Sequence, residues 1–290
     1  VISGYIGFDN FGDEAICAVL TEHLKLAEAE KITVLSANPS KTSSLYGVNS
    51  VHMLKFLKPI IESDVLISGG GSLLQDVTSL KSLVYYLTVI VTALLLRKKV
   101  LIFAQGFTPF KSGIGEILTK FVLKNCNKIT VRDKTSQNFL EKMGIKSSLV
   151  NDPVLNLNFP QNSFHKGVGV QLRSFETLSD EFIKKLAEEI SKNFPNQEIK
   201  LFSFQDNSDL PVLKHFGKYL TANGNIIKIY KNNSISEIVN EISSLEYLVA
   251  MRFHACILAF KTQVKLLGIN YDIKVKTISE NIGFPVINMY

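Results

Sequence analysis

The chain has 290 residues, enough for two domains of about 150 residues each. With 46% hydrophobic and 20% charged residues, it is too apolar to be intrinsically disordered. The net charge of +6 suits anionic ligands or an anionic surface. As a mild excess spread over a chain without Trp, it does not indicate a nucleic acid partner.

The sequence does not indicate a membrane span, a signal segment or a disulfide framework. The longest uncharged apolar run, residues 82–96, has 15 residues, whereas a span takes about 20. We interpret it as a buried helix that leaves room for a membrane-proximal surface. The chain opens in a predicted strand rather than in a basic and then apolar leader. Cys17, Cys126 and Cys256 lie far apart in apolar helical contexts, which predicts core positions in a reducing, cytoplasmic compartment.

Short apolar runs alternate with helical patterns through the first half of the chain. Runs without polar positions are typical of parallel strands that helices cover on both faces. We predict strands at residues 1–6, 31–37, 51–53, 64–68, 99–105, 128–132 and 148–151, and helices at 14–29, 82–96, 114–125 and 135–143.

The alternation stops at residues 152–166, where Pro153 and Pro160 stand among polar residues, and then resumes. In the second half we predict strands at 167–172, 198–204, 225–229, 247–251 and 264–269, and helices at 179–193, 210–223, 235–243 and 254–260. The predicted fold is therefore α/β, with two Rossmann-like domains facing a cleft. We place the domains at residues 1–155 and 166–290, with a linker at 156–165.

Ligands of open parallel sheets bind beyond the carboxyl ends of the strands, so the residues after each strand are candidates for the site. The first strand leads into a glycine-rich loop that contains Asn10 and Asp13. Two interpretations stay open for this loop. Either it is a glycine turn in which Asp13 caps the following helix, or it presents polar groups to the cleft.

A glycine triplet, Gly69, Gly70 and Gly71, follows the predicted strand at 64–68. Consecutive glycines allow the backbone to approach a ligand or another loop closely. If a helix begins near Ser72, its free N–H groups would favour an anion, and Asp76 would lie on the same side of that helix.

Cationic side chains close several strands. Arg132 ends the strand at 128–132 and is a candidate anion clamp, although a structural Arg–Asp pair with Asp133 is the alternative. Asp133 is also the expected cap of the next helix. Arg173 closes the first strand of the second half.

Arg252 and His254 lie at the strand-to-helix corner after residues 247–251. Lys274 follows the strand at 264–269, so it could approach His254. A satisfied structural histidine and a surface lysine remain the alternatives for these two residues. No P-loop, GxSxG, HExxH or paired CxxC motif competes with this set, and the sequence shows no carboxylate cluster for a metal.

Taken together, these blocks resemble the polysaccharide pyruvyl transferase family, close to its bacterial cell-wall polymer branch. They appear in order along nearly the whole chain: GYIGFDNFGDEA at 4–15, DVLISGGGSLLQD at 64–76, AQG at 104–106, VRDKTS at 131–136, NDP at 151–153, AMRFHA at 250–255 and YDIKV at 271–275.

The resemblance implies a fold like the GT-B glycosyltransferases and transfer of pyruvate from phosphoenolpyruvate onto two hydroxyls of one sugar, as a cyclic ketal. In the cell-wall branch that sugar looks like a β-linked N-acetylmannosamine, ketalised at O4 and O6, in a lipid-linked or polymeric precursor. Such secondary cell wall polymers serve S-layer anchoring. The resemblance implies no required cofactor and no metal, and it leaves room for peripheral association with the inner face of the membrane.

By the matching motifs, Arg132, His254 and Lys274 are the expected catalytic residues on the donor. A histidine can move protons near neutral pH, and fixed cations suit the carboxylate and phosphate of phosphoenolpyruvate. Arg173 and Arg252 are further cationic candidates on the donor side, the second domain. From the first domain, Asn10, Asp13, Asp76 and residues 69–71 are expected to face the acceptor sugar.

Two other functions remain open at the level of sequence. One is a GT-B sugar-nucleotide glycosyltransferase or epimerase, which would share the fold and a cationic cleft. The other is a degenerate, non-catalytic family member that binds wall polymer or a partner, against which the presence of Arg132, His254 and Lys274 together argues.

Overall fold

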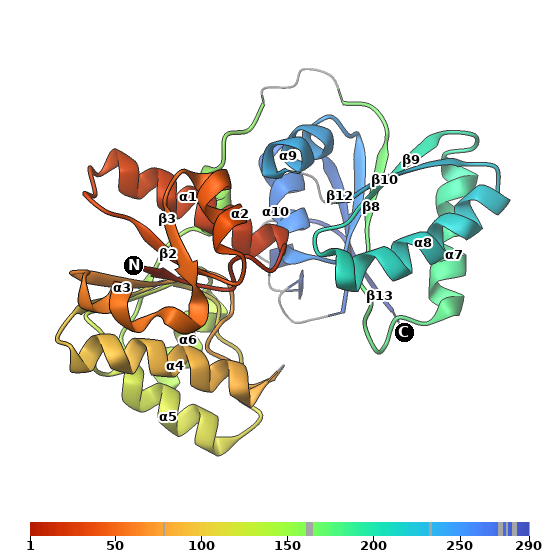
Figure 1. Ribbon diagram of the computed structural model, residues 1–290. Helices are drawn as coiled ribbons and strands as arrows, with labels where there is room; N and C mark the ends of the chain where they lie inside the picture. Colours follow the sequence, from red (N-terminus) through yellow and green to blue (C-terminus); the bar gives the residue numbers. More distant parts are fainter. Residues whose placement is uncertain are drawn as a thin grey trace. The chain divides into compact units, whose positions relative to one another are not determined.

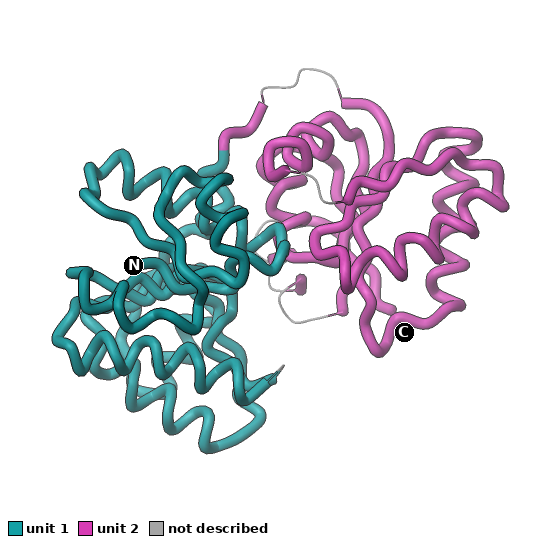
Figure 2. The backbone as a smooth tube through the Cα atoms, in the orientation of Figure 1, with its two compact units in different colours: residues 1–157 teal, residues 158–290 magenta. Residues whose placement is uncertain are grey.

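The computed structural model describes residues 1–77, 79–160, 165–231, 234–271, 275–276, 278–279 and 283–289. The chain forms two compact units, residues 1–157 and 158–290 (Figure 2). The division falls inside the segment that the sequence indicates as a linker. Each unit is a parallel α/β sheet with its own hydrophobic core, so the predicted fold class is confirmed.

Unit 1 contains a seven-stranded, fully parallel sheet with the order β3-β2-β1-β4-β5-β6-β7. Its strands are β1 (Ile2–Ser3), β2 (Thr33–Ser36), β3 (Asn49–His52), β4 (Val65–Gly69), β5 (Lys99–Gln105), β6 (Lys128–Val131) and β7 (Ser148–Leu149). The central strands are buried because helices cover both faces of the sheet (Figure 1).

The helices of unit 1 are α1 (Phe11–Leu26), α2 (Pro39–Tyr46), α3 (Leu57–Ile61), α4 (Leu80–Leu95), α5 (Gly113–Leu123) and α6 (Lys134–Lys142), with short 3₁₀ turns η1 (Met53–Lys55) and η2 (Pro153–Asn156). In Figure 1, α1 and α2 lie on one face of the sheet and α3, α4 and α5 on the other. Side-chain caps begin most of these helices, for example Ser79 at α4 and Asp133 at α6.

Unit 2 contains a six-stranded parallel sheet with the order β10-β9-β8-β11-β12-β13. Its strands are β8 (Val168–Gln171), β9 (Glu198–Phe202), β10 (Ile226–Tyr230), β11 (Tyr247–Ala250), β12 (Lys265–Asn270) and β13 (Val286–Asn288). Its helices are α7 (Asp180–Asn193), α8 (Asp206–Ala222), α9 (Ile235–Ser243) and α10 (Phe253–Lys261).

The strand order reverses once in each sheet, between β1 and β4 in unit 1 and between β8 and β11 in unit 2. These are the topological switch points, and the loops beyond the carboxyl ends of their strands are the places where such sheets bind ligands. In unit 1 they are the loop after Ser3 and the glycine triplet, and in unit 2 they contain Arg173 and residues 251–254.

Most predicted elements are present within a few residues of their expected ends, and β5 and α9 match in full. The helices α2 and α3 and the strand β13 were not predicted, and β1 is shorter than the predicted strand at 1–6. The apolar run at 82–96 forms most of α4, whose inner face buries Leu83, Tyr86, Leu87 and Ile90 in the core of unit 1. No helix in the described ranges combines the length and apolar character needed to cross a bilayer.

Candidate active site

The loop after β1 ends at Asn10, where α1 begins. The side chain of Asn10 accepts a hydrogen bond from the Gly12 amide at 3.1 Å and so caps the helix. The prediction that Asp13 is the cap is wrong, because the helix begins at Phe11 and Asp13 already lies in its first turn. In the first turn, the carboxylate of Asp13 is still stabilised by the positive end of the helix dipole.

Glu14, in the first turns of α1, holds the loop after β1 through a hydrogen bond to Gly7. Its carboxylate accepts hydrogen bonds from the Gly7 amide at 2.7 Å and from the Tyr46 hydroxyl at 2.5 Å, and the residue is 9% exposed. Burial raises the pKa of this carboxyl, against the opposing effect of both hydrogen bonds. Gly7 has φ +82°, and a Cβ at this position would lie 2.2 Å from the Ser36 hydroxyl, so no larger residue fits there without rearrangement.

The glycine triplet after β4 packs tightly against α1. A Cβ at Gly70 would lie 2.4 Å from Ile16, and one at Gly71 would lie 2.6 Å from an Asp13 carboxylate oxygen. Both glycines have positive φ. The condition for an anion site near Ser72, a helix that begins there, is not met, since α4 begins only at Leu80.

Asp76 does not lie on a helix beside an anion site. It contacts the residues just before α5 instead. Its carboxylate accepts hydrogen bonds from the Lys111 amide at 2.7 Å, the Ser112 amide at 2.8 Å and the Ser112 hydroxyl at 2.6 Å. Burial works against ionisation, but these hydrogen bonds prevail and lower the pKa of Asp76. The residue ties the loop before α4 to the start of α5.

Arg132 lies at the carboxyl end of β6 with 4% of its side chain exposed. Its guanidinium contacts Asp152 at 3.1 Å, Asp133 at 4.0 Å and the Ser72 hydroxyl at 3.4 Å. A Cβ at Gly106 would lie 3.0 Å from its Nη2. The loops after β4, β5 and β6 thus meet around one guanidinium whose charge two carboxylates balance.

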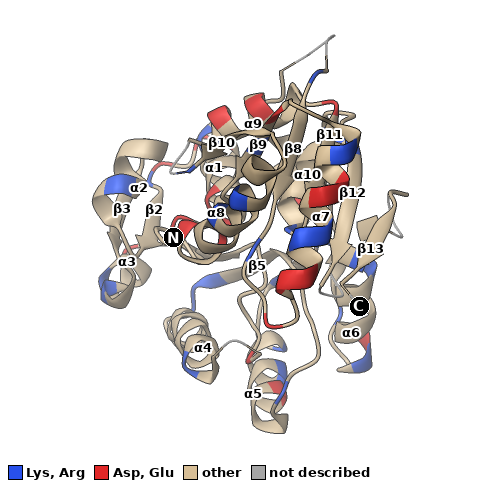
Figure 3. Ribbon diagram, turned by 90° about the vertical axis from the view of Figure 1, so that its right-hand side faces the viewer, with Lys and Arg blue, Asp and Glu red and all other residues tan. Residues whose placement is uncertain are grey.

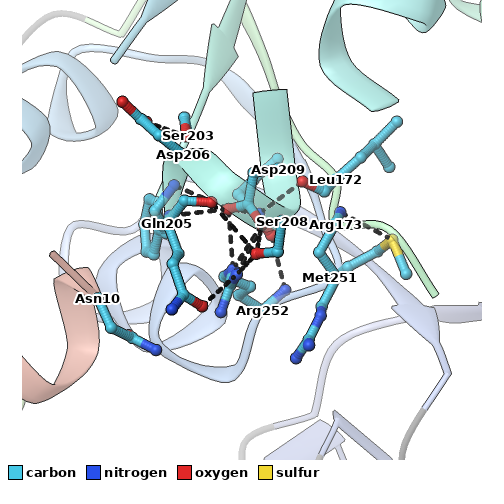
Figure 4. A network of polar contacts seen from close by, with 12 residues as sticks. Asn10, Leu172, Arg173, Ser203, Gln205, Asp206, Ser208, Asp209, Met251 and Arg252 are labelled. Carbon is cyan, nitrogen blue, oxygen red and sulfur yellow. Dashed lines mark hydrogen bonds and ion pairs between the residues drawn. The ribbon is translucent and has the colours of Figure 1, made fainter. Parts of the chain in front are cut away.

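Unit 2 contains a second buried arginine in a denser network (Figure 4). Arg252 directs Nε and Nη2 at the Asp209 carboxylate, at 2.9 and 2.6 Å, and Nη2 also donates to the Ser208 hydroxyl at 2.6 Å. Asp209 is fully buried and also accepts hydrogen bonds from the amides of Phe204 and Gln205. The network binds the loop after β11 to the loop between β9 and α8.

Gln171 connects this network to the switch point. Its Oε1 accepts from the Arg252 amide at 2.7 Å, and its Nε2 donates to Asp209 at 3.2 Å. Nε and Nη2 of Arg252 are committed to Asp209, whereas Nη1 makes no hydrogen bond within the described parts of the chain.

Arg173, directly after β8, does not share the Asp209 carboxylate, and Figure 4 shows its guanidinium extending away from that residue. Its Nη1 donates to the Tyr271 hydroxyl at 3.4 Å, and its guanidinium carbon lies 5.5 Å from the centre of the Tyr271 ring. Its Nε is buried without a hydrogen-bond partner among the described residues. A buried N–H group of a cation in this state favours an anionic acceptor as its missing partner.

His254 is the second residue of α10, next to the carboxyl end of β11. Its ring lies edge-to-face on Phe253, with the ring centres 5.2 Å apart. Because β8 and β11 are neighbours in register, the loops that contain Arg173, Arg252 and His254 emerge side by side. Lys274 lies outside the described residues.

The expected site residues therefore form two groups. Arg132, Asn10, Asp13, Asp76 and residues 69–71 belong to unit 1, while Arg173, Arg252 and His254 gather at the switch point of unit 2. Sequence analysis missed Asp209 and Gln171. Their only signal was their position after or near strand ends, which many polar residues share. The described residues contain no group of His, Cys, Asp and Glu side chains arranged to hold a metal ion.

Solved structures with a similar fold include an epimerase and a glycosyltransferase. UDP-GlcNAc 2-epimerase from Methanocaldococcus jannaschii aligns with a TM-score of 0.67 at 13% identity, over 100% of this chain and 89% of that one. A glycosyltransferase from Rickettsia africae aligns with a TM-score of 0.61 at 12% identity, over 99% and 83% of the two chains. The chain thus has the GT-B fold of glycosyltransferases and epimerases; at such low identity, the likeness establishes the fold alone.

The family is established by sequence. A family model for polysaccharide pyruvyl transferase matches residues 10–273. The chain therefore belongs to the polysaccharide pyruvyl transferase family, and it is a transferase by class. No curated protein matches the sequence.

Proposed function

We propose that the protein transfers pyruvate from phosphoenolpyruvate to a sugar of a cell-wall polysaccharide precursor as a cyclic ketal, and that the donor binds at the switch point of unit 2. Membership of the family supports the reaction class. The observation that supports the donor position is Arg173, whose buried Nε has no partner among the described residues.

Phosphoenolpyruvate carries a carboxylate and a phosphate on the same carbon, C2, so it needs two cationic positions. Arg173 offers its Nε edge, and Arg252 offers Nη1 while Asp209 fixes the rest of its guanidinium. A guanidinium held by a buried carboxylate pays little conformational entropy when the donor binds. Lys274, four residues beyond the end of β12 in the sequence, is proposed as a third positive charge.

The reaction requires controlled movement of two protons. A proton must reach the methylene carbon of the donor, so that C2 becomes electrophilic and the first sugar hydroxyl attacks it. The proton that this hydroxyl loses replaces the one that was given to the methylene carbon. Phosphate then leaves, the second hydroxyl closes the ketal, and its proton leaves with the phosphate. We propose His254 as the acid and base for these transfers, because imidazole exchanges protons near neutral pH.

Unit 1 is the proposed acceptor side. Asn10, Asp13 and residues 69–71 lie at its switch point, where a Cβ on Gly71 would lie 2.6 Å from the Asp13 carboxylate. Arg132 is enclosed by Asp152 and Asp133, so we propose that it orders the loops after β4, β5 and β6 and meets the donor only with its remaining positive potential. A β-linked N-acetylmannosamine, ketalised at O4 and O6 in a lipid-linked precursor at the inner face of the membrane, is the proposed acceptor.

The fold neighbours favour one alternative, a sugar-nucleotide glycosyltransferase or epimerase. A ligand-induced shift of the thermal unfolding midpoint distinguishes the two functions, because a ligand that binds only the folded state stabilises it. We expect phosphoenolpyruvate to raise the midpoint in the wild type and not in Arg173→Ala. A rise with UDP-GlcNAc or UDP-glucose and none with phosphoenolpyruvate would favour the alternative.

A further inference from the structure

Exposed apolar side chains concentrate on one part of unit 1. Among the described residues, 18 large hydrophobic side chains are exposed, and half of them lie between residues 77 and 121. They are Val77, Leu80, Val84, Leu95, Leu96, Ile114, Ile117, Leu118 and Phe121. Single exposed apolar residues are ordinary on a protein surface, whereas a cluster of this size indicates a partner.

The helix α5 is apolar on its outer face as well as on its inner face. Ile114, Ile117 and Phe121 are 67%, 68% and 70% exposed, and Leu118 beside them is 42% exposed. Their spacing of three, four and seven residues places all four on one side of the helix. The opposite side, with Val122 and Leu123, is buried in the core. The folding of unit 1 therefore does not explain the outer face.

The neighbouring helix α4 continues this pattern. Leu80, Val84 and Leu95 are 48%, 46% and 79% exposed, and their spacing of four and fifteen residues aligns them along one side. The two helices are in contact, and Figures 1 and 3 show them side by side in one layer. We call the outward faces of α4 and α5, with the lysines that border them, the α4–α5 surface.

The charge of the chain is concentrated in the same segment. Residues 77–128 contain eight Lys and Arg and one acidic residue, Glu116, a net charge of +7. The remaining 238 residues contain 24 basic and 25 acidic residues. The expectation that the positive excess is spread evenly is thus wrong. In the ribbon of Figure 3, blue marks basic positions on α4 and α5. Lys81 lies in α4 and Lys120 in α5, Lys124 directly follows α5, and the other basic residues of the segment lie outside the two helices.

We propose that the α4–α5 surface binds the surface of an anionic phospholipid membrane, with α5 lying in the interface. Exposed apolar side chains flanked by lysines are the features of helices that lie in the headgroup region without crossing it. Anionic lipids attract the lysines, and the acyl boundary takes up Ile114, Ile117 and Phe121. A lipid-linked acceptor would then diffuse in the plane to which the enzyme is bound.

A second copy of this chain is a poorer occupant of the surface. A symmetric dimer would place the same patch against itself, so that a segment of charge +7 would face an identical one. Like charges opposed across an interface disfavour association. An anionic surface satisfies both the apolar and the charged parts of the patch.

Co-sedimentation with large unilamellar vesicles tests the proposal directly. We expect the wild type to bind vesicles of phosphatidylcholine mixed with phosphatidylglycerol, to bind pure phosphatidylcholine much more weakly, and to be released by high salt. Ile117→Ser combined with Phe121→Ser should weaken binding about tenfold or more. Lys120→Gln combined with Lys124→Gln should weaken it about tenfold or more on anionic vesicles alone.

Matched controls separate the patch from general changes in the surface. Leu26→Ser removes a side chain that is 76% exposed at the end of α1, on the other face of the sheet, and should leave binding unchanged. Lys184→Gln combined with Lys185→Gln removes two exposed lysines of α7 in unit 2 and should also have no effect. Because all substituted side chains are exposed or at the rim, thermal unfolding midpoints should stay close to that of the wild type.

Equal vesicle binding by the wild type and the Ile117/Phe121 double variant would overturn the proposal. So would a dimer in solution that this double variant dissociates, together with absence of vesicle binding. The binding assay contains no donor or acceptor, so its outcome is independent of whether the proposed reaction is correct. Turnover with a water-soluble acceptor should be the same in the patch variants as in the wild type.

Discussion

Three arginines at strand ends differ in what surrounds them, and that difference decides their proposed roles. Arg132 and Arg252 are each paired with a buried carboxylate, from Asp152 and Asp209. Arg173 has a tyrosine hydroxyl and a tyrosine ring, but no carboxylate among the residues that the structure describes. A cation whose charge is already balanced gains less from an anionic donor than one that is not.

The first prediction follows from this contrast. Arg173→Ala should raise the KM for phosphoenolpyruvate about 10–100-fold, the usual cost of a lost hydrogen bond to a charged group. Arg173→Lys should recover part of it, because lysine keeps the charge but not the planar fork. Initial rates at varied donor concentration measure both variants. If Arg132→Ala raises the KM more than Arg173→Ala while the protein stays folded, the assignment of Arg173 as the main clamp is wrong.

His254 should affect the chemical step rather than binding. We expect His254→Ala to lower kcat about 10²–10⁴-fold, the range typical of a lost general acid or base, with little change in donor affinity. Single-turnover phosphate release compared with donor binding in the thermal assay separates the two effects. Wild-type turnover in His254→Ala would remove the residue from the mechanism.

Glu14 gives a prediction about pH. Its folded-state pKa is raised by burial, so its contribution to the free energy of unfolding is most favourable below its unfolded pKa and decreases as the pH rises through its folded pKa. Glu14→Gln keeps an acceptor for Gly7 and removes the titration. Its stability relative to the wild type should therefore increase from acid to neutral pH in denaturant unfolding series. A constant difference across that range would contradict this reading.

At the scale of elements, the Asp209 network joins the loops after β8, β9 and β11. Asp209→Ala would leave Arg252 buried without its carboxylate, which typically costs about 3–5 kcal/mol. Denaturant unfolding should show a loss of that size. Ser203→Ala, which removes only a hydroxyl that is bonded to Asp206 at the edge of the same loop, serves as the control and should cost about 1 kcal/mol. A similar small loss in both variants would mean that solvent replaces the carboxylate.

The elements also show what sequence could and could not predict. Strands such as β5 and helices such as α9 were predictable because their hydrophobic period and caps are local. The helices α2 and α3 escaped because they are short and their apolar residues are few or partly exposed. The cap of α1 was misplaced by three residues because Asn10 and Asp13 are both good caps.

The candidate site was predictable as positions but not as contacts. The alternation of strands and helices, together with the rule that parallel sheets bind ligands at strand ends, was enough to predict the positions of Arg132, Arg173, Arg252 and His254. The partner of Arg132, Asp152, lies 20 residues away, and that of Arg252 lies 43 residues away. Such pairings depend on tertiary packing, which no local pattern encodes.

At the scale of the whole molecule, two parallel sheets provide two sets of loops. The sheets share the order of six strands, unit 1 adds β7 at one edge, and each order reverses at one switch point. The unit 1 loops contain several glycines, and the unit 2 loops contain the cationic side chains of Arg173 and Arg252. This difference in composition suits the proposed substrates, a neutral sugar acceptor at unit 1 and an anionic donor at unit 2. The positive excess of the chain follows a third pattern, since it falls in residues 77–128, the segment of unit 1 that contains α4 and α5 and the basic residues that flank them.

The most direct test of pyruvyl transfer is mass spectrometry of a synthetic β-N-acetylmannosaminyl acceptor after incubation with the protein and phosphoenolpyruvate, with phosphate measured in parallel. We predict an acceptor that gains one ketal-linked pyruvate per phosphate released, and no gain with His254→Ala. An unmodified acceptor with phosphoenolpyruvate, together with turnover of a UDP-sugar under the same conditions, would contradict the proposed function and favour sugar-nucleotide chemistry instead.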